Sequence, residues 1–317
     1  MAYETGTAEN ERDLLDKINK FLTTNEELVR EGQAWTTLLD RTLEATPTRQ
    51  AIRQIAWKST GTGVEQDIYV CASTYNNISQ DTYNIKIAGG TFFSEGLLQS
   101  DISDTFINKS PYVTVCADAR QFEYGIVASG RCFKVYTRIT NTNICSSCYA
   151  GFILPTVTPV EYPYPLCIAG ASNSDIRYSE TGNNHSSIVD AKKDNFWLFT
   201  PDQTWRTFSG RNHSSTGHES QYQILHPAYI YNNDSYNILK KITGLNDNYP
   251  LFPIEIISTA NSVQKVNRWG ALDGVYWIPG VQRSIFDTVQ IDEKTTGIIL
   301  NNAYRTTTSD FYVIEYV

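Results

Sequence analysis

The sequence predicts a mainly β protein, with an antiparallel β-sandwich or barrel-like core and a short N-terminal helical segment. Twenty Tyr, 13 Phe and 6 Trp accompany a single Met, a composition that suits pleated sheets better than a helical bundle. Beyond residue 34 the apolar residues come in short runs of strand length, and many runs alternate with polar residues. At 317 residues, the chain is long enough to bury a sizeable core without cross-links such as disulfides or structural metals.

The helical segment is predicted over residues 7–23 (TAENERDLLDKINKFLT), with Thr7 as its cap. A second short helix is expected after the capping-box pattern Thr24-x-x-Glu27, ending at Gly32. An isolated helix of this length is marginal in water, so its apolar stripe must be covered. The cover is either this chain's own sheet or a neighbouring subunit, in which case residues 1–32 form an assembly arm. The stripe consists of Leu14, Leu15, Ile18, Phe21 and Leu22.

The stretch from Cys145 to Gly170 is the segment around which we expect the rest of the chain to be arranged. It holds four of the chain's 11 prolines, at 155, 159, 163 and 165, so no helix can run through it. We predict a strand that ends at Leu154, an aromatic crossover, and a new strand that starts at Leu166. Because the crossover is so apolar, we expect it to be clamped between two sheets or against a neighbouring subunit. Candidate interface residues are therefore the five of the helix stripe together with Tyr162 and Tyr164.

The remaining strands are expected in two β lobes, residues 34–170 and 171–317, or in one continuous β domain after an N-terminal segment of residues 1–33. Turn residues between alternating runs predict hairpins. The run 131–139 (RCFKVYTRI) is expected to be a half-buried strand with its charged face exposed. Pro253 indicates an edge strand or a bend, and partial helical spacing suggests a short helix within 232–244. The predicted hairpins join 67–73 with 82–88, 124–128 with 131–139, and 195–199 with 205–208; tail strands follow at 249–258, 274–278, 288–291, 296–300 and 311–316.

Charge and composition argue against several classes of function. A net charge of -8 without a basic run argues against nucleic acid as a ligand. Residues 1–30 lack the pattern of a signal peptide, and no run of about 18 apolar residues predicts a membrane span. We therefore expect a chain that folds in a cytoplasm, with six free cysteines that act as small buried hydrophobes; the alternative is disulfide formation in an extracellular particle.

No motif predicts an enzyme, a metal or a cofactor. Cys145-x-x-Cys148 lacks the two further ligands of a structural zinc site. His213 and His218, with Glu219 beside them, match no usual metal spacing and are predicted to be solvated loop residues. The run 59–63 (STGTG) lacks the ending of a phosphate-binding loop and is predicted to be a turn.

Eight segments, taken in order from end to end, carry a resemblance to a known family. They are 1–8 (MAYETGTA), 13–23 (DLLDKINKFLT), 67–70 (DIYV), 149–166 (YAGFILPTVTPVEYPYPL), 249–253 (YPLFP), 270–276 (GALDGVY), 302–306 (NAYRT) and 310–312 (DFY). These segments resemble a family of virion structural proteins of tailed bacteriophages. The polar segment 171–195 departs from the pattern.

The resemblance implies a non-enzymatic component of a tail, neck, collar or baseplate ring, assembled in the bacterial host cytoplasm, that contacts other virion proteins and forms a symmetric homo-oligomer. The alternative is a receptor-binding module that recognises a host-surface glycan through Tyr, Trp and Asn. A hydrolase is the third class.

Overall fold

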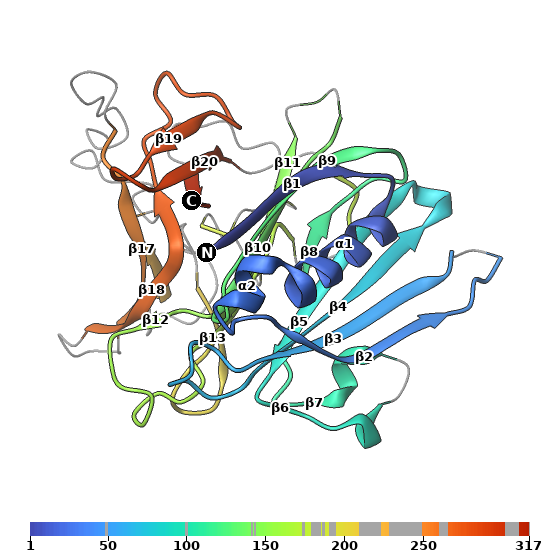
Figure 1. Cartoon of the computed structure of the whole chain (residues 1–317), viewed down its shortest axis with the longest axis horizontal. Coiled ribbons are helices and arrows are strands. Elements are labelled where there is room, and N and C mark those ends of the chain that lie inside the picture. Colours follow the sequence, from blue (N-terminus) through green and yellow to red (C-terminus); the bar gives the residue numbers. More distant parts are fainter. Residues whose placement is uncertain are drawn as a thin grey trace.

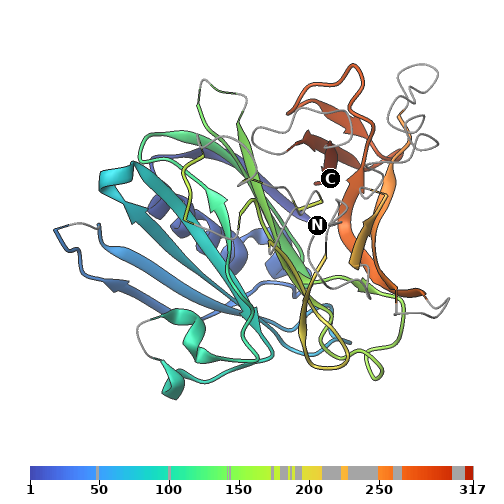
Figure 2. The same ribbon diagram turned by 180° about the vertical axis from the view of Figure 1, so that it is seen from behind.

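The computed structural model confirms a mainly β protein with one N-terminal helical segment (Figure 1). Three antiparallel sheets lie one against the next, and the middle sheet separates two hydrophobic cores; the view from behind shows the same three layers (Figure 2). The structure describes residues 1–47, 50–98, 101–140, 142, 144–172, 175–178, 185, 188–189, 195–208, 223–227, 249–259, 266–301 and 311–316.

The central sheet has seven strands, and every neighbouring pair is antiparallel. In spatial order they are β1 (Ala2–Ala8), β9 (Phe122–Ala128), β10 (Cys132–Arg138), β11 (Cys145–Phe152), β13 (Leu166–Ala169), β14 (Phe196–Phe199) and β15 (Trp205–Thr207).

Each face of the central sheet is covered by another sheet. The first outer sheet consists of β2 (Thr36–Leu43), β3 (Ile52–Ser59), β4 (Ile68–Asn77), β5 (Thr82–Gly90) and β8 (Val113–Cys116). The second consists of β16 (Gln223–His226), β17 (Phe252–Thr259), β18 (Val266–Trp277), β21 (Tyr312–Glu315), β20 (Thr296–Leu300) and β19 (Thr288–Gln290), with β12 (Leu154–Pro155) paired to β18. A small hairpin is formed by β6 (Phe92–Phe93) and β7 (Phe106–Ile107), and the segment that connects them holds the 3-10 helices η2 (Glu95–Leu97) and η3 (Ile102–Thr105). A further 3-10 helix, η1 (Ile78–Gln80), lies in the turn between β4 and β5.

Strand β10 shows how the central sheet serves both cores. Phe133 and Val135 point into the core shared with the first outer sheet, whereas Cys132 and Tyr136 point into the core shared with the second. The prediction of an exposed charged face on this strand is wrong, because Lys134 is fully buried. The charged residues suggested that this face of the strand is in contact with solvent, but the second outer sheet covers it.

The N-terminus begins with a strand that the sequence did not predict. β1 pairs with β9 over its whole length, from Ala2 opposite Ala128 to Ala8 opposite Phe122. The helix α1 (Glu11–Thr24) therefore starts later than expected, and its cap is Asn10, which accepts hydrogen bonds from the backbone of the first turn.

The apolar stripe of α1 is covered by this chain's own sheets. All five residues of the stripe are buried in the first core, so the fold itself supplies the partner surface that the helix needs. The short helix α2 (Glu26–Arg30) follows, capped by Asn25 rather than by the predicted Thr24. The assembly-arm alternative is not the arrangement in this structure. The residues covered in this way are Leu14, Leu15, Ile18, Phe21 and Leu22.

The three predicted hairpins are present, as β4–β5, β9–β10 and β14–β15. Pro253 lies at a register shift in β17, which confirms the bend, but β17 is flanked by β16 and β18 and is not an edge strand. The helix predicted within 232–244 falls outside the described residues. The division into segments 1–33, 34–170 and 171–317 stays a prediction.

Candidate functional site

The crossover between β12 and β13 carries a tightly built turn, residues 156–161, which we call the crossover turn. The Glu161 carboxylate accepts hydrogen bonds from the backbone N–H and the hydroxyl of Thr158, at 3.1 and 2.9 Å. The backbone N–H groups of Glu161 and Tyr162 both donate to the Thr158 carbonyl oxygen at 3.0 Å. Pro159, with its restricted φ, follows Thr158. The turn is therefore ordered by its own bonds.

The crossover turn and the strand β12 before it present apolar side chains to solvent. Val160 is 92% exposed, and Val157 and Leu154 are 42% and 41% exposed. Only the far end of the crossover is clamped between sheets: Tyr162 is buried, its hydroxyl donates to the Phe199 carbonyl oxygen, and its ring meets Trp269 at 6.2 Å. The expected clamping thus holds for Tyr162, and nothing in the described part of the chain covers Val160.

A pocket of about 170 Å³ lies beside the crossover, and we call it the crossover pocket. The crossover, the ends of the β6–β7 hairpin and the turn after β14 each contribute to its wall. Among the described residues, no charged side chain lines it. Its lining residues are Thr91, Asn108, Tyr162, Pro163, Tyr164, Phe199, Thr200, Pro201 and Gln203.

The turn after β14 is fixed by a hydrogen-bonded carboxylate. Burial acts to raise the pKa of Asp202, but hydrogen bonds from Arg206, Thr200 and Thr204 outweigh it and lower this pKa to about 2. The next residue, Gln203, has a φ of 59° and donates its backbone N–H to the Thr200 carbonyl oxygen at 2.8 Å. The turn therefore stays in one shape across the ordinary pH range.

Across the pocket, Asn108 also has a left-handed backbone, with a φ of 50°. Its side-chain amide donates to the Thr91 hydroxyl at 3.1 Å, and its carbonyl oxygen accepts a hydrogen bond from the indole N–H of Trp205 at 2.8 Å. By contrast, the side-chain amide of Gln203 and the hydroxyl of Tyr164 make no hydrogen bond within the described residues. The pocket thus offers uncharged donors and acceptors beside apolar walls.

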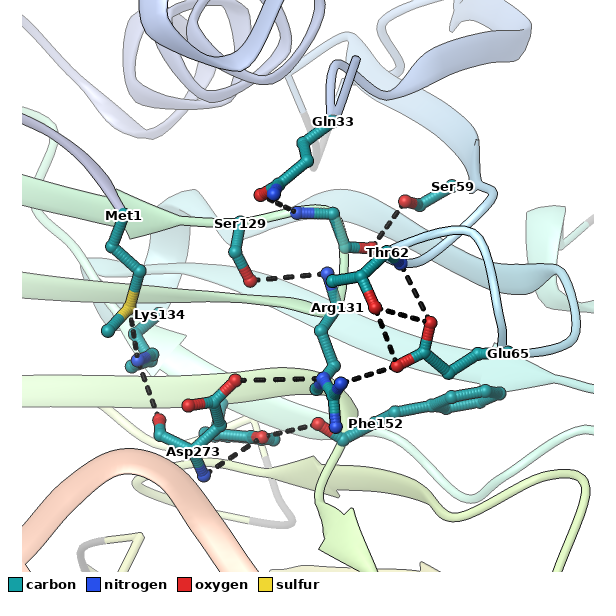
Figure 3. Close-up of polar contacts among 12 residues, drawn as sticks. Met1, Gln33, Ser59, Thr62, Glu65, Ser129, Arg131, Lys134, Phe152 and Asp273 are labelled. Carbon is teal, nitrogen blue, oxygen red and sulfur yellow. Dashed lines mark hydrogen bonds and ion pairs between the residues drawn. The ribbon is translucent and has the colours of Figure 1, made fainter. Parts of the chain in front are cut away.

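A second polar group, the three-sheet charge cluster, lies where the three sheets meet (Figure 3). Arg131, in the turn between β9 and β10, forms an ion pair with Glu65 from the first outer sheet's β3–β4 turn, at 2.5 Å between Nη2 and Oε1. Its Nε lies 3.9 Å from a carboxylate oxygen of Asp273 in β18. Lys134 donates to the Asp273 carbonyl oxygen at 2.7 Å and to the Met1 sulfur at 3.3 Å.

The charged groups of this cluster have a structural role, because they pair with one another. Burial acts to raise the pKa of Glu65, but hydrogen bonds from Thr62 and the charge of Arg131 outweigh it, so the pKa is lowered. Each cation is engaged by acceptors from another sheet, which leaves neither Arg131 nor Lys134 available for a ligand. The cluster joins the central sheet to both outer sheets.

The cysteines and the two described histidines, His185 and His226, take no part in the crossover site. All six cysteines are free and buried, as predicted, and burial raises the pKa of Cys145 and of Cys148 to about 12. These two lie on opposite faces of β11, in different cores. His213, His218 and Glu219 fall outside the described residues. Within the described part of the chain, no three His, Cys, Asp or Glu side chains gather in a way that could hold a metal ion, and no helix there is long and apolar enough to span a membrane.

Sequence reasoning found two residues of the crossover pocket, Tyr162 and Tyr164, and missed the others. Residues 201–204 were recognisable as a turn, but nothing in their pattern indicates that the turn faces the crossover. No family model and no curated protein matches this chain.

Proposed function

We propose that this protein is a structural subunit of a tailed-phage virion, part of a tail, neck, collar or baseplate ring, and that it acts through protein–protein contacts rather than as an enzyme. The proposal includes assembly in the host cytoplasm, a symmetric homo-oligomer and contacts with other virion proteins. It is supported by the ordered resemblance of segments from both ends of the chain, and the mainly β fold is compatible with it.

The observation that carries the proposal is the exposed apolar tip of the crossover turn. Fully burying a valine side chain contributes about 1.5–3 kcal/mol, and Val160 exposes almost all of its side chain. The turn is already ordered by its bonds to Thr158 and Glu161, so docking would cost little further conformational entropy. An ordered, apolar projection of this kind suits a repeated contact between subunits.

The crossover turn is a place where another copy of this chain can bind despite the negative charge of both copies. Each copy has a net charge of -8, so two copies repel each other over most of their surfaces. The crossover turn carries a single charged side chain, Glu161, and its carboxylate is engaged by Thr158. An apolar contact there brings two acidic copies together with little like-charge penalty, and a closed ring repeats the contact by symmetry.

The test compares Val160→Asp with Val64→Asp. Val64 is also a highly exposed valine, at 72%, in the turn between β3 and β4, and both substitutions add one negative charge. We expect both variants to melt like the parent, and only Val160→Asp to lose self-assembly in mass photometry and incorporation into particles. A Val160→Asp chain that assembles and joins particles like the parent would refute the contact, and a low-resolution map of labelled particles would give the subunit's position.

A further inference from the structure

The size of the crossover pocket restricts its ligand to one small ring. The pocket measures about 170 Å³, and an engineered cavity of about 150 Å³ takes up benzene. Tyr162 and Phe199 are buried, whereas Pro201 and Gln203 at the mouth are exposed, so a ligand enters from solvent at the Gln203 side. A single six-membered ring fits this space, and a longer chain would have to extend outward.

The chemistry of the walls selects an uncharged ring with hydroxyl groups. The lining residues that the structure describes are all uncharged, and aromatic and proline side chains form much of the pocket's surface. Such surfaces pack against the C–H face of a sugar ring. Within the described residues the Gln203 amide and the Tyr164 hydroxyl make no hydrogen bond. The amide supplies both a donor and an acceptor, and the hydroxyl supplies a third polar group. A pyranose presents C–H groups and hydroxyls together.

The backbone around the pocket is held in a costly conformation. In the described part of the chain five non-glycine residues have a positive φ, and two of them, Asn108 and Gln203, line this pocket. Such residues persist where the surrounding structure enforces them, and they gather at ligand sites. Here the enforcing bonds are those from Trp205 to Asn108 and from Gln203 to Thr200.

The same free groups argue against an apolar side chain of a second copy as the occupant. An apolar side chain would displace water from the Gln203 amide and the Tyr164 hydroxyl without replacing its hydrogen bonds, which costs about 1–3 kcal/mol for each buried group. Sugar hydroxyls restore those bonds. The balance favours the sugar.

We propose that the crossover pocket binds one neutral hexopyranose unit, with Gln203 and Tyr164 as its hydrogen-bonding residues. That the sugar is the terminal unit of a host-surface glycan rests on the proposed virion function; the binding itself does not. The contact at Val160 and the sugar site are separate surfaces of the same crossover, so each can be removed alone.

The test uses the whole chain and saturation-transfer NMR with glucose, galactose, mannose and N-acetylglucosamine, each at about 20 mM, because sites with few contacts bind in the millimolar range. We expect transfer to at least one of these sugars and none to sialic acid, whose carboxylate meets no cation in the pocket. Gln203→Ala and Tyr164→Phe should each weaken binding about threefold to tenfold, as expected for one lost hydrogen bond.

The matched control is Gln282→Ala, because Gln282 also has a positive φ, of 57°, and lies outside the pocket. Gln282→Ala and Val160→Asp should both bind sugar like the parent. Gln203→Ala should still self-assemble. Absence of transfer to all four sugars would overturn the proposal, as would equal binding by Gln203→Ala and Gln282→Ala. Loss of self-assembly in Gln203→Ala, with no sugar bound by the parent, would assign the pocket to a protein partner instead.

Discussion

Replacement of Arg131 by methionine tests the three-sheet charge cluster directly. The substitution keeps an unbranched apolar side chain but removes the cation from Glu65 and Asp273, whose side chains are 8% and 21% exposed. Removing one partner of a buried ion pair costs about 3–5 kcal/mol, because the remaining charge stays poorly solvated. Since Arg131 is itself 18% exposed, water reaches part of the cluster, and we expect a loss near the lower end, about 3 kcal/mol.

The assay is urea unfolding, in which a shift of the midpoint at unchanged slope reports stability. Arg30→Met is the control, because the pair of Arg30 with Glu31 is exposed and such pairs contribute about 0–1 kcal/mol. Adding Glu65→Gln to Arg131→Met should recover part of the loss, since it removes the unpaired charge. A loss below about 1 kcal/mol for Arg131→Met, or one equal to that of Arg30→Met, would refute the reasoning.

Three smaller predictions concern packing, charge and thiol reactivity. Gly130→Ala places a Cβ 2.1 Å from the Gly61 carbonyl oxygen, so we expect its melting temperature to be several degrees lower than that of the parent. Gly96→Ala, whose Cβ would meet no atom closer than 3.9 Å, should melt like the parent. Equal melting temperatures for the two variants would contradict the clash. Burial raises the pKa of Glu11, so the stability that its proton contributes is complete below the unfolded pKa of about 4.3 and is lost as pH rises through the folded pKa. Glu11→Gln should therefore gain stability over the parent as the pH rises above that unfolded pKa. Glu26→Gln, at the exposed start of α2, should show no such gain, and parallel pH profiles for the two variants would count against the assignment. The six thiols are buried, which raises their pKa. They should therefore react with a disulfide reagent only as the chain unfolds, and a reductant should leave the melting temperature unchanged. Rapid labelling of the folded protein would contradict this prediction.

The local parts of the fold were predictable from sequence. The β4–β5, β9–β10 and β14–β15 hairpins join strands that are close in the chain, where turn residues and alternation carry the signal. The pairing of β1 with β9 was not predictable in this way, because it joins Ala2 to Ala128 across most of the first half of the chain. No local pattern records a partner that distant.

Burial of a strand on both faces also cannot be predicted from the alternation of apolar and polar residues. Lys134 interrupts an apolar strand, and in a two-layer sandwich such a residue would face water. Here a third sheet covers that face, and the ammonium group finds the carbonyl oxygen of Asp273 instead. Gly274, next to it, has a φ of 63°, and a Cβ there would lie 2.7 Å from the lysine nitrogen. The compensation for the buried charge lies 139 residues away in sequence.

The candidate site was partly predictable, because the prolines mark the crossover but not its neighbours. Their rings remove backbone donors, which prevents residues 156–165 from continuing a ladder, and the two tyrosines indicate where the loop returns to the core. The opposite wall comes from Asn108, which is held by Trp205 of β15, and from the turn at Gln203, which is held by its own bond to Thr200. The contact between Asn108 and Trp205 joins residues 97 apart in sequence, so no local pattern indicates it.

The placement of the crossover explains why both proposed contacts sit on it. At one end β12 pairs with β18 of the second outer sheet, and at the other β13 lies inside the central sheet. The crossover turn is thus anchored to two sheets at once, and Tyr162 fixes its return by a bond to Phe199. These bonds hold Val160 in a fixed position, which suits the proposed contact between subunits. The same anchoring holds the wall of the crossover pocket in place before any ligand binds. The conformational entropy of these residues is therefore lost when the sheets fold, and little more is lost when a ligand binds.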